Sequence, residues 1–165
     1  MRIGVDIDNV LSNFDEVLKE QYLKHDKELG GRGIVNKNVY IKHAFDWDYE
    51  YERKFYLDNI EYFASLLKPI NNCQKYIRKL KEEGNEIYII TGRDNGEYSN
   101  PYNMTVNWLK ENNIYYDKLF LVDAYDSHSK TKICLKYNID VMIDDSKRIL
   151  KDITDFGLRA IIMDT

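Results

Sequence analysis

Residues 1–10 read MRIGVDIDNV, a short apolar run in which two carboxylates appear at the end. The stretch from Arg2 to Ile7 has the apolar and β-branched character of a strand that is buried on both faces. Because side chains alternate along a strand, Asp6 and Asp8 are expected on the same side, at its carboxyl end. The opening residues therefore predict a strand that brings two acidic groups to one edge of a sheet.

Similar runs recur along the chain, at Glu86 to Thr91, Leu119 to Asp123, Val141 to Asp144 and Arg159 to Met163. Segments with a helical period separate them, and turn residues mark the helix ends. Pro69 and Pro101 suit the first turn of a helix, and Ser129 and Ser146 suit N-cap positions. Gly84 and Gly157 suit positions just past the end of a helix. Alternating strands and helices predict an α/β fold, a three-layer Rossmann-like domain with a parallel sheet.

One interval, residues 10–69, interrupts this alternation, although a parallel crossover needs only about a dozen residues. It contains two helical stripes around a Gly-rich turn at 30–33, which are formed by Phe14, Val17, Leu18 and Tyr22 and by Tyr56, Ile60, Phe63 and Leu67. We expect a helical cap at 10–69, inserted into a core of residues 1–9 and 70–165. The interval holds 11 of the 22 aromatic residues, which suits either a thin core or a stacking surface for a flat ligand.

The composition narrows the class of function. A chain of 165 residues suits about one domain, and its 24 basic and 28 acidic residues are interleaved, which disfavours capture of duplex nucleic acid. The N-terminus lacks the apolar stretch of a signal peptide, and no apolar run approaches the length of a membrane span. Cys73 and Cys134 are expected as reduced core residues. We expect a cytoplasmic protein, a monomer or homodimer, without a membrane or duplex nucleic-acid partner.

Further polar groups follow the other predicted strands. The fourth strand ends in Asp144-Asp145, and the second ends in Thr91-Gly92. Lys130 opens the helix before the fourth strand, where a cation opposes the helix dipole, and Lys132 lies about 200° further around that helix. Each feature alone also suits an ordinary cap, turn or solvated side chain. Together they predict a magnesium–phosphate site, because Mg²⁺ prefers oxygen ligands while hydroxyl, amide and ammonium groups hold phosphate.

The order of these motifs, Asp-x-Asp, Thr, Lys and Asp-Asp, resembles the haloacid dehalogenase superfamily over almost the whole chain. A helical cap inserted after the first strand is also a feature of that superfamily's first cap class. Residues 5–14, VDIDNVLSNF, are most similar to the 5'(3')-deoxyribonucleotidase family, with Phe14 in the place of an aromatic residue eight positions beyond Asp6. Two departures occur: Asn9 replaces the usual Gly, and Thr91-Gly92-Arg93 is closer to the general superfamily pattern.

The resemblance implies a hydrolase, a Mg²⁺-dependent phosphomonoesterase that acts on a small phosphomonoester, with a nucleoside monophosphate as the expected substrate. Asp6 would attack phosphorus, and Asp8 would first protonate the leaving group and later deprotonate water. Thr91, Gly92 and Lys130 would bind the phosphoryl oxygens.

The same resemblance implies that Mg²⁺ is held by Asp6, the Asp8 main-chain carbonyl and either Asp144 or Asp145. Phe14 would stack on the base, with Phe45, Trp47 and Tyr49 as weaker candidates for the same role.

Two alternatives stay open at this stage. The catalytic residues do not identify the leaving group, so a phosphatase for a sugar phosphate or another small phosphomonoester is a competing hypothesis. A phosphoacceptor signalling domain or a catalytically silent binding domain is the alternative from another class. The order of the motifs and the 60-residue insertion argue against the phosphoacceptor, and the intact motif positions argue against the silent domain.

Overall fold

The computed structural model describes residues 1–37, 39–70 and 72–164, and the chain divides into two compact units. The first unit comprises residues 1–12 and the chain from residue 68 onward, and the second comprises residues 13–67. These boundaries lie two or three residues inside the expected cap of 10–69. Contacts of Leu11 and Ser12 explain the difference: the Ile70 amide donates to the Leu11 carbonyl, and Ser12 pairs with Pro69.

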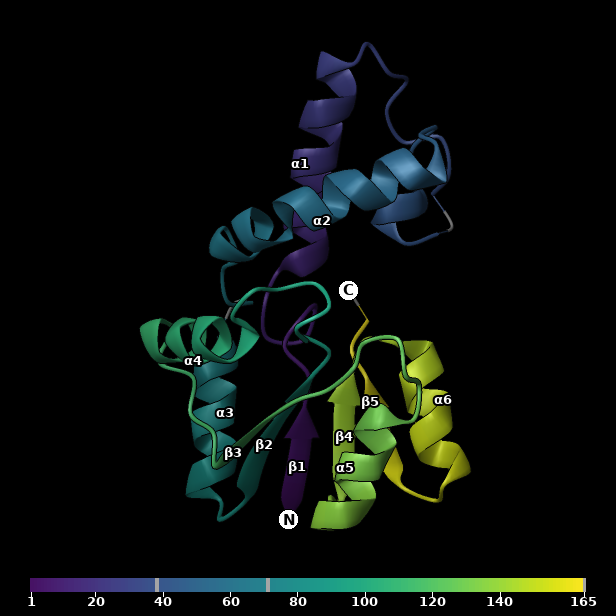
Figure 1. Ribbon diagram of the computed structural model, residues 1–165. Helices are drawn as coiled ribbons and strands as arrows, with labels where there is room; N and C mark the ends of the chain where they lie inside the picture. The colour runs from purple at the N-terminus through teal and green to yellow at the C-terminus, as the bar shows by residue number, and fades with distance from the viewer. Residues whose placement is uncertain (38, 71, 165) are drawn as a thin grey trace. The chain divides into compact units, whose positions relative to one another are not determined.

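The first unit is built on a parallel sheet of five strands in the order β3-β2-β1-β4-β5, as Figure 1 shows. The strands are β1 (Arg2–Val5), β2 (Glu86–Thr91), β3 (Lys118–Leu121), β4 (Val141–Asp144) and β5 (Arg159–Ile162). The central strand β1 pairs with β2 on one side and with β4 on the other. In open α/β sheets, ligands bind at the carboxyl ends of strands beside such a reversal of strand order. The predicted α/β class and parallel sheet are confirmed.

Four helices connect these strands: α3 (Cys73–Glu82), α4 (Pro101–Glu111), α5 (Ser129–Tyr137) and α6 (Lys147–Asp155). Several predicted helix ends are confirmed. Pro101 is the first residue of α4, and the Ser146 side chain caps α6 by accepting from the Ile149 amide. Gly84 and Gly157 follow helix ends with φ of +83° and +79°, values at which a side chain would be strained.

Two predicted helix starts are wrong. Pro69 does not open a helix; Asn72 is the N-cap of α3, and the helix begins at Cys73. Ser129 is the first residue of α5 rather than its N-cap, because its hydroxyl donates to the Asp123 carbonyl and His128 occupies the cap position.

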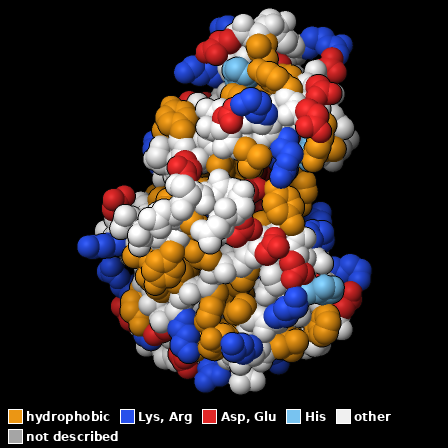
Figure 2. Space-filling view, in the orientation of Figure 1, with side chains coloured by type: hydrophobic (Ala, Val, Ile, Leu, Met, Phe, Trp, Pro, Cys, Tyr) orange, Lys and Arg blue, Asp and Glu red, His pale blue; other side chains and the backbone are white. Residues whose placement is uncertain are grey.

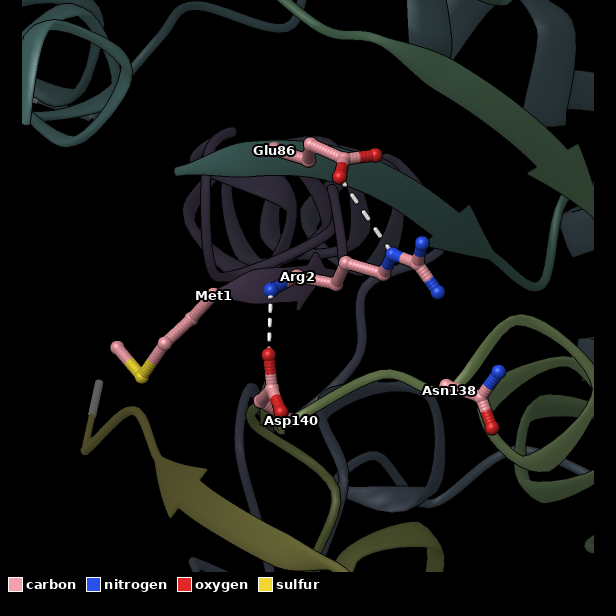
Figure 3. Close-up of a pocket in the computed structure, with 5 residues that line it drawn as sticks. All are labelled: Met1, Arg2, Glu86, Asn138 and Asp140. Carbon is pink, nitrogen blue, oxygen red and sulfur yellow. Dashed lines mark hydrogen bonds and ion pairs between the residues drawn. The ribbon is translucent and has the colours of Figure 1, made fainter. Parts of the chain in front are cut away.

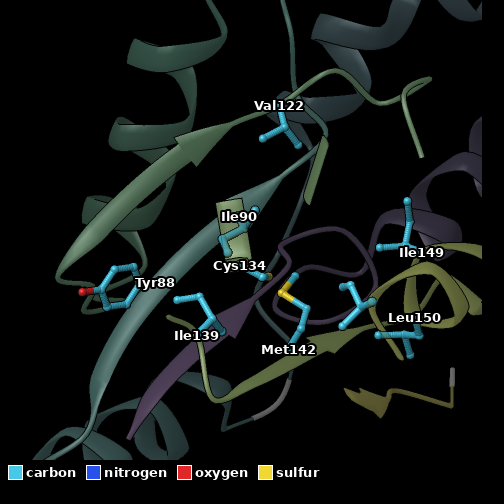
Figure 4. Close-up of a cluster of buried hydrophobic side chains, with 9 residues drawn as sticks. Tyr88, Ile90, Val122, Cys134, Ile139, Met142, Ile149 and Leu150 are labelled. Atoms are coloured by element: carbon cyan, nitrogen blue, oxygen red, sulfur yellow. The ribbon is translucent and has the colours of Figure 1, made fainter. Parts of the chain in front are cut away.

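The sheet is covered on one face by a hydrophobic cluster that links β2 and β4 to α5 and α6. Figure 4 shows these side chains converging: Tyr88, Ile90, Val122, Cys134, Ile139, Met142, Ile149 and Leu150, with Ile153 completing the cluster. Both cysteines are buried free thiols, as predicted. The expectation that every strand is buried on both faces fails for the two edge strands. The residues of β3 are exposed or partly buried, and Ile161 and Ile162 of β5 are exposed.

The second unit consists of α1 (Phe14–Glu28), the 3₁₀ turn η1 (Ile41–His43) and α2 (Tyr49–Ser65). Aromatic rings fill its interior around the fully buried Tyr22, which stacks on Trp47 at 5.1 Å and meets the edge of Phe55 at 5.1 Å. Phe45 and Trp47, considered above as base-stacking residues, also contact one another within this cluster. Most of the aromatic enrichment is therefore explained by a thin core.

The same unit buries two carboxylates, and each is hydrogen-bonded. The two oxygens of Asp26 accept from the Trp47 indole (2.8 Å) and from the Gly33 amide (2.7 Å). Glu52 accepts from the Tyr22 hydroxyl at 2.7 Å. Burial and this carboxylate raise the pKa of Tyr22, so the phenol remains a donor. These carboxylates stabilise the unit by tying its loop and helices together.

The face of the molecule in Figure 2 carries Lys and Arg side chains interspersed with Asp and Glu. This mixture agrees with the interleaved charges of the sequence. In the described part of the chain, no helix has both the length and the apolar character needed to cross a membrane.

Candidate active site

Asp6 lies directly beyond β1, at the carboxyl edge of the sheet. Its amide donates to the Ile143 carbonyl of β4, and its carboxylate is buried against the Lys130 ammonium, with Oδ2 and Nζ 2.9 Å apart. Among the described residues, Oδ1 of Asp6 is one of three buried side-chain oxygens without a hydrogen-bond partner. Burial raises the pKa of Asp6 to about 6, against the opposing effect of Lys130 and with help from the Asp144 and Asp8 carboxylates. A buried carboxylate oxygen without a partner is unusual in a protein core and therefore marks a candidate ligand site.

Lys130 joins Asp6 to Asp144. Its ammonium lies 2.7 Å from Asp144 Oδ2, while the other oxygen of Asp144 accepts from the Ser146 amide at 2.9 Å. Burial lowers the pKa of Lys130, but the two carboxylates outweigh burial and raise it above its usual value. Lys132 instead pairs with Asp126 on the surface. Of the two lysines at the start of α5, Lys130 is therefore the one that contacts the candidate site residues Asp6 and Asp144.

A third carboxylate, that of Asp145, completes an acidic cluster with Asp6 and Asp144. One carboxylate oxygen from each of the three lies within 4.8 Å of the others. The Asn9 side chain donates to Asp145 Oδ2 at 2.9 Å, and its backbone adopts the left-handed conformation with φ of +60°. Asn tolerates this conformation better than most residues other than Gly, which explains how it occupies the turn. The oxygen-only donor set, with a buried orphan oxygen on Asp6, fits a hard divalent cation such as Mg²⁺.

Thr91 and Gly92 lie at the end of β2, the neighbour of β1. Thr91 is fully buried, and its hydroxyl is another of the buried oxygens without a partner in the described part of the chain. A Cβ on Gly92 would lie 3.1 Å from the Ala124 side chain and 3.3 Å from its backbone, closer than ordinary contacts. The loop after β2 therefore packs against residue 124 because position 92 has no side chain.

Asp8 has a partner that sequence reasoning missed. The guanidinium of Arg93 contacts both carboxylate oxygens of Asp8, with Nη2–Oδ1 at 2.5 Å and Nε–Oδ2 at 3.3 Å. The Ser12 hydroxyl adds a donor to Oδ1 at 3.1 Å. Arg93 is almost wholly buried, at 1% exposure. The signal was available in part: two acids beside each other at a sheet edge need cations, and Arg93 stands two residues after Thr91.

The first unit thus brings together Asp6, Lys130, Asp144 and Asp145, while Thr91 and Gly92 end the adjacent strand. Phe14 belongs to the second unit, where it begins α1 and is half-buried. Its contact with a base therefore stays a prediction.

A cavity of about 310 Å³ lies at the opposite, amino edge of the sheet and contains none of the predicted site residues. Figure 3 shows its lining, in which Arg2 bridges the other side chains: its amide donates to Asp140 (2.6 Å) and its guanidinium to Glu86 (3.5 Å). Met1 and Asn138 complete the wall. Arg2, Asp140 and Glu86 pair with one another, so the buried oxygens of Asp6 and Thr91 that lack partners among the described residues are the stronger indication of a ligand.

Comparison with known proteins adds a family and a fold. The family model described as "5' nucleotidase, deoxy (Pyrimidine), cytosolic type C protein" matches residues 1–165. A protein from Chlorobaculum tepidum that is provisionally named a 5'(3')-deoxyribonucleotidase is 28% identical over 174 residues, covering 96% of this chain and 76% of that protein.

Solved structures of low identity share the fold. A hydrolase from Streptococcus pneumoniae TIGR4 has a TM-score of 0.66 at 12% identity, covering 99% of this chain and 92% of its own. A haloacid dehalogenase superfamily hydrolase of subfamily IA from Geobacter sulfurreducens has a TM-score of 0.61 at 11% identity, covering 98% and 88%.

Proposed function

We propose, from the premise that the chain belongs to the family of cytosolic type C deoxy (pyrimidine) 5'-nucleotidases, that it hydrolyses nucleoside monophosphates through an aspartyl-phosphate. The chain is a phosphoric monoester hydrolase with the haloacid dehalogenase fold. The observation that supports the mechanism is the carboxylate of Asp6, which is buried against Lys130 and whose Oδ1 has no hydrogen-bond partner among the described residues.

In the first half-reaction, Asp6 Oδ1 would attack phosphorus. The bond between phosphorus and the leaving oxygen breaks, its electron pair stays on that oxygen, and Asp8 gives it a proton. The products are the free nucleoside and an acyl phosphate on Asp6. Lys130, already 2.9 Å from Asp6, would offset the negative charge that develops on the phosphoryl oxygens.

In the second half-reaction, a water molecule would attack the phosphorus of the acyl phosphate while Asp8 takes its proton. The bond between phosphorus and Asp6 Oδ1 breaks, and its electron pair restores the carboxylate. Over both steps, one phosphomonoester and one water give one alcohol and one inorganic phosphate.

Asp6 and the pair Asp144-Asp145 would hold Mg²⁺, with the Asp8 main-chain carbonyl as a further oxygen ligand. When bound, the cation would supply positive charge beside the phosphate and so reduce repulsion between the substrate and the carboxylates. The hydroxyl of Thr91, which has no partner among the described residues, and the backbone amide of Gly92 would donate to the phosphoryl oxygens.

The second unit would act as a cap, and Phe14 would stack on the base. Stacking on an aromatic side chain contributes on the order of 1–3 kcal/mol per base, which supports a preference for nucleotides over substrates without a base. The family description also supports a cytosolic location.

A phosphate-release panel tests this proposal. Purified protein is assayed with Mg²⁺ or with EDTA on pyrimidine and purine deoxynucleoside monophosphates, hexose phosphates and glycerol phosphate. We expect Mg²⁺-dependent release, with kcat/KM for the nucleotides at least about tenfold above the sugar phosphates, given the free energy of one stacked base. Equal or better turnover of the sugar phosphates would contradict the nucleotide assignment.

Two further readouts examine the mechanism and the cap. Acid quenching during turnover should trap a phosphoprotein that hydroxylamine cleaves; a stable phosphoprotein without phosphate release would instead identify a phosphoacceptor.

Phe14→Ala should raise KM for nucleotides but not for glycerol phosphate. Phe156→Ala, which changes an exposed phenylalanine of the first unit, serves as the control and should leave both unchanged.

A further inference from the structure

Arg93 is the largest of the fully buried side chains in the described chain, and its guanidinium faces Asp8. Burying an isolated cation is expensive, so a buried arginine persists where a fixed anion compensates it. Both contacts to Asp8 are made by one planar guanidinium, which defines the orientation of the carboxylate as well as its position. The Arg93–Asp8 pair is therefore a partly buried ion pair of defined geometry at the sheet edge, unlike an exposed ion pair on the surface.

Arg93 contacts a second side chain besides Asp8, the ring of Trp108. Arg93 follows Thr91 and Gly92 at the end of β2, and its guanidinium carbon lies 5.9 Å from the centre of the Trp108 ring of α4. Burial alone would lower the pKa of Arg93, but Asp8 outweighs it and raises the pKa, so the side chain remains a cation. The guanidinium is thus held before any substrate arrives.

The two oxygens of Asp8 are engaged unequally. Oδ1 accepts from Arg93 Nη2 at 2.5 Å and from the Ser12 hydroxyl at 3.1 Å, whereas Oδ2 accepts from Arg93 Nε at the longer distance of 3.3 Å. Two donors anchor one oxygen and leave the other with more capacity. Oδ2 is therefore the atom better suited to exchange a proton with a reacting group.

We propose that Arg93 is a positioning residue, which fixes the carboxyl of Asp8 in the orientation from which it transfers protons in both half-reactions. The inference rests on the proposed function. It assigns Arg93 to Asp8 rather than to phosphate, and it explains why a large cation is buried after the Thr91-Gly92 turn.

Substrates whose leaving groups differ in basicity can distinguish a role of Arg93 in proton transfer from a general effect of the substitution on the fold. Release of a nucleoside requires proton transfer to an alkoxide, whereas 2,4-dinitrophenolate leaves without a proton. Because kcat/KM covers the steps up to release of the alcohol, loss of Asp8 orientation should lower it for the nucleotide and spare the aryl phosphate.

The experiment compares wild type with Arg93→Lys and Arg93→Met on a deoxynucleoside monophosphate and on 2,4-dinitrophenyl phosphate. For Arg93→Lys, kcat/KM should fall about 100-fold or more on the nucleotide and less than about threefold on the aryl phosphate, in line with the usual size of general acid catalysis. The aryl substrate should also show a burst of dinitrophenolate, because Asp8 still has to activate water in the second step. Arg93→Met should show the same pattern more strongly.

Arg78→Met, at an exposed arginine of α3, is the matched control and should behave as wild type. Arg93→Lys retains the buried charge, so it carries the test if Arg93→Met does not fold. Equal loss of kcat/KM on both substrates, or wild-type values in Arg93→Lys, would overturn the role of Arg93. If the proposed function itself is wrong, the result differs: wild type would release no phosphate from the nucleotide.

Discussion

The two units bury carboxylates in opposite ways. In the second unit, Asp26 accepts from an indole and an amide, and Glu52 accepts from the Tyr22 hydroxyl. In the first unit, Asp6 is similarly buried, but one of its oxygens and the Thr91 hydroxyl have no hydrogen-bond partner among the residues that the structure describes. Native proteins pair nearly all of their buried polar groups, so the exceptions require a reason. The comparison shows that burial alone does not indicate a ligand site. Two buried oxygens at the ends of the adjacent strands β1 and β2, on Asp6 and Thr91, that lack partners among the described residues are a stronger indication.

The largest effect should come from Asp6→Asn, which removes the nucleophile. We expect phosphate release to fall by at least about 10⁴-fold, comparable with loss of the nucleophile in other covalent enzymes. Phosphate release and circular dichroism, measured on the same preparation, separate chemistry from folding. Asp140→Asn, at the amino edge of the sheet, is the control and should retain activity within about twofold. Comparable activity in Asp6→Asn would contradict its role as nucleophile.

Removal of Lys130 should have the next largest effect, because it leaves the carboxylates of Asp6 and Asp144 buried without their cation. Loss of one partner of a buried ion pair costs about 3–5 kcal/mol, so urea unfolding of Lys130→Met should show a decrease of that order. Lys132→Met, which breaks only a surface pair with Asp126, should change stability by less than about 0.5 kcal/mol. Similar values for the two variants would show that the buried pairs do not stabilise the site.

In the second unit, Tyr22→Phe should convert a satisfied carboxylate into an unsatisfied one. Glu52 would lose the hydroxyl donor at 2.7 Å, which costs about 1–3 kcal/mol for a buried group. Each unit contains one tryptophan, so fluorescence of Trp47 in a Trp108→Phe background reports on the second unit. The reciprocal background, Trp47→Phe, follows the first unit, where we expect no comparable loss of stability.

The smallest effect on stability is expected at Thr91 and Thr105, two threonines whose buried hydroxyls have no partner in the described part of the chain. Replacing either by Val removes an unpaired polar group at nearly constant volume, so stability should stay the same or rise by up to about 1 kcal/mol. Only Thr91→Val should also weaken phosphate binding, seen as a higher Ki for inorganic phosphate. An unchanged Ki in Thr91→Val, or a raised one in Thr105→Val, would remove the link between the unpaired Thr91 hydroxyl and the ligand.

The strands of the sheet and most residues of the candidate site could be predicted from the sequence. The bounds of the strands Glu86–Thr91 and Val141–Asp144 agree with the prediction to the residue, because runs of buried apolar residues end there in polar residues. The carboxyl edge of a parallel sheet then indicated that Asp6 and Asp144 would lie together, and they share Lys130.

The features that could not be predicted from the sequence depend on contacts between segments that are distant along the chain. Ser129 has the composition of an N-cap, but the Asp123 carbonyl takes its hydroxyl. Pro69 suits a first helical turn, but it pairs with Ser12 instead. An arginine in a loop normally indicates a solvated side chain, and only its contact with Asp8, 85 positions away, shows that Arg93 is buried. Such choices are made by tertiary packing, which local patterns do not encode.

The Asp-x-Asp pair is divided between two cations from different segments, Lys130 for Asp6 and Arg93 for Asp8. Together with Asp144 and Asp145, these two carboxylates and their two buried cations carry a formal charge of −2, from four negative and two positive groups. One divalent cation would bring the site to neutrality. Any substitution that changes this count by one should therefore alter the dependence on cation concentration, even where every remaining group keeps its place.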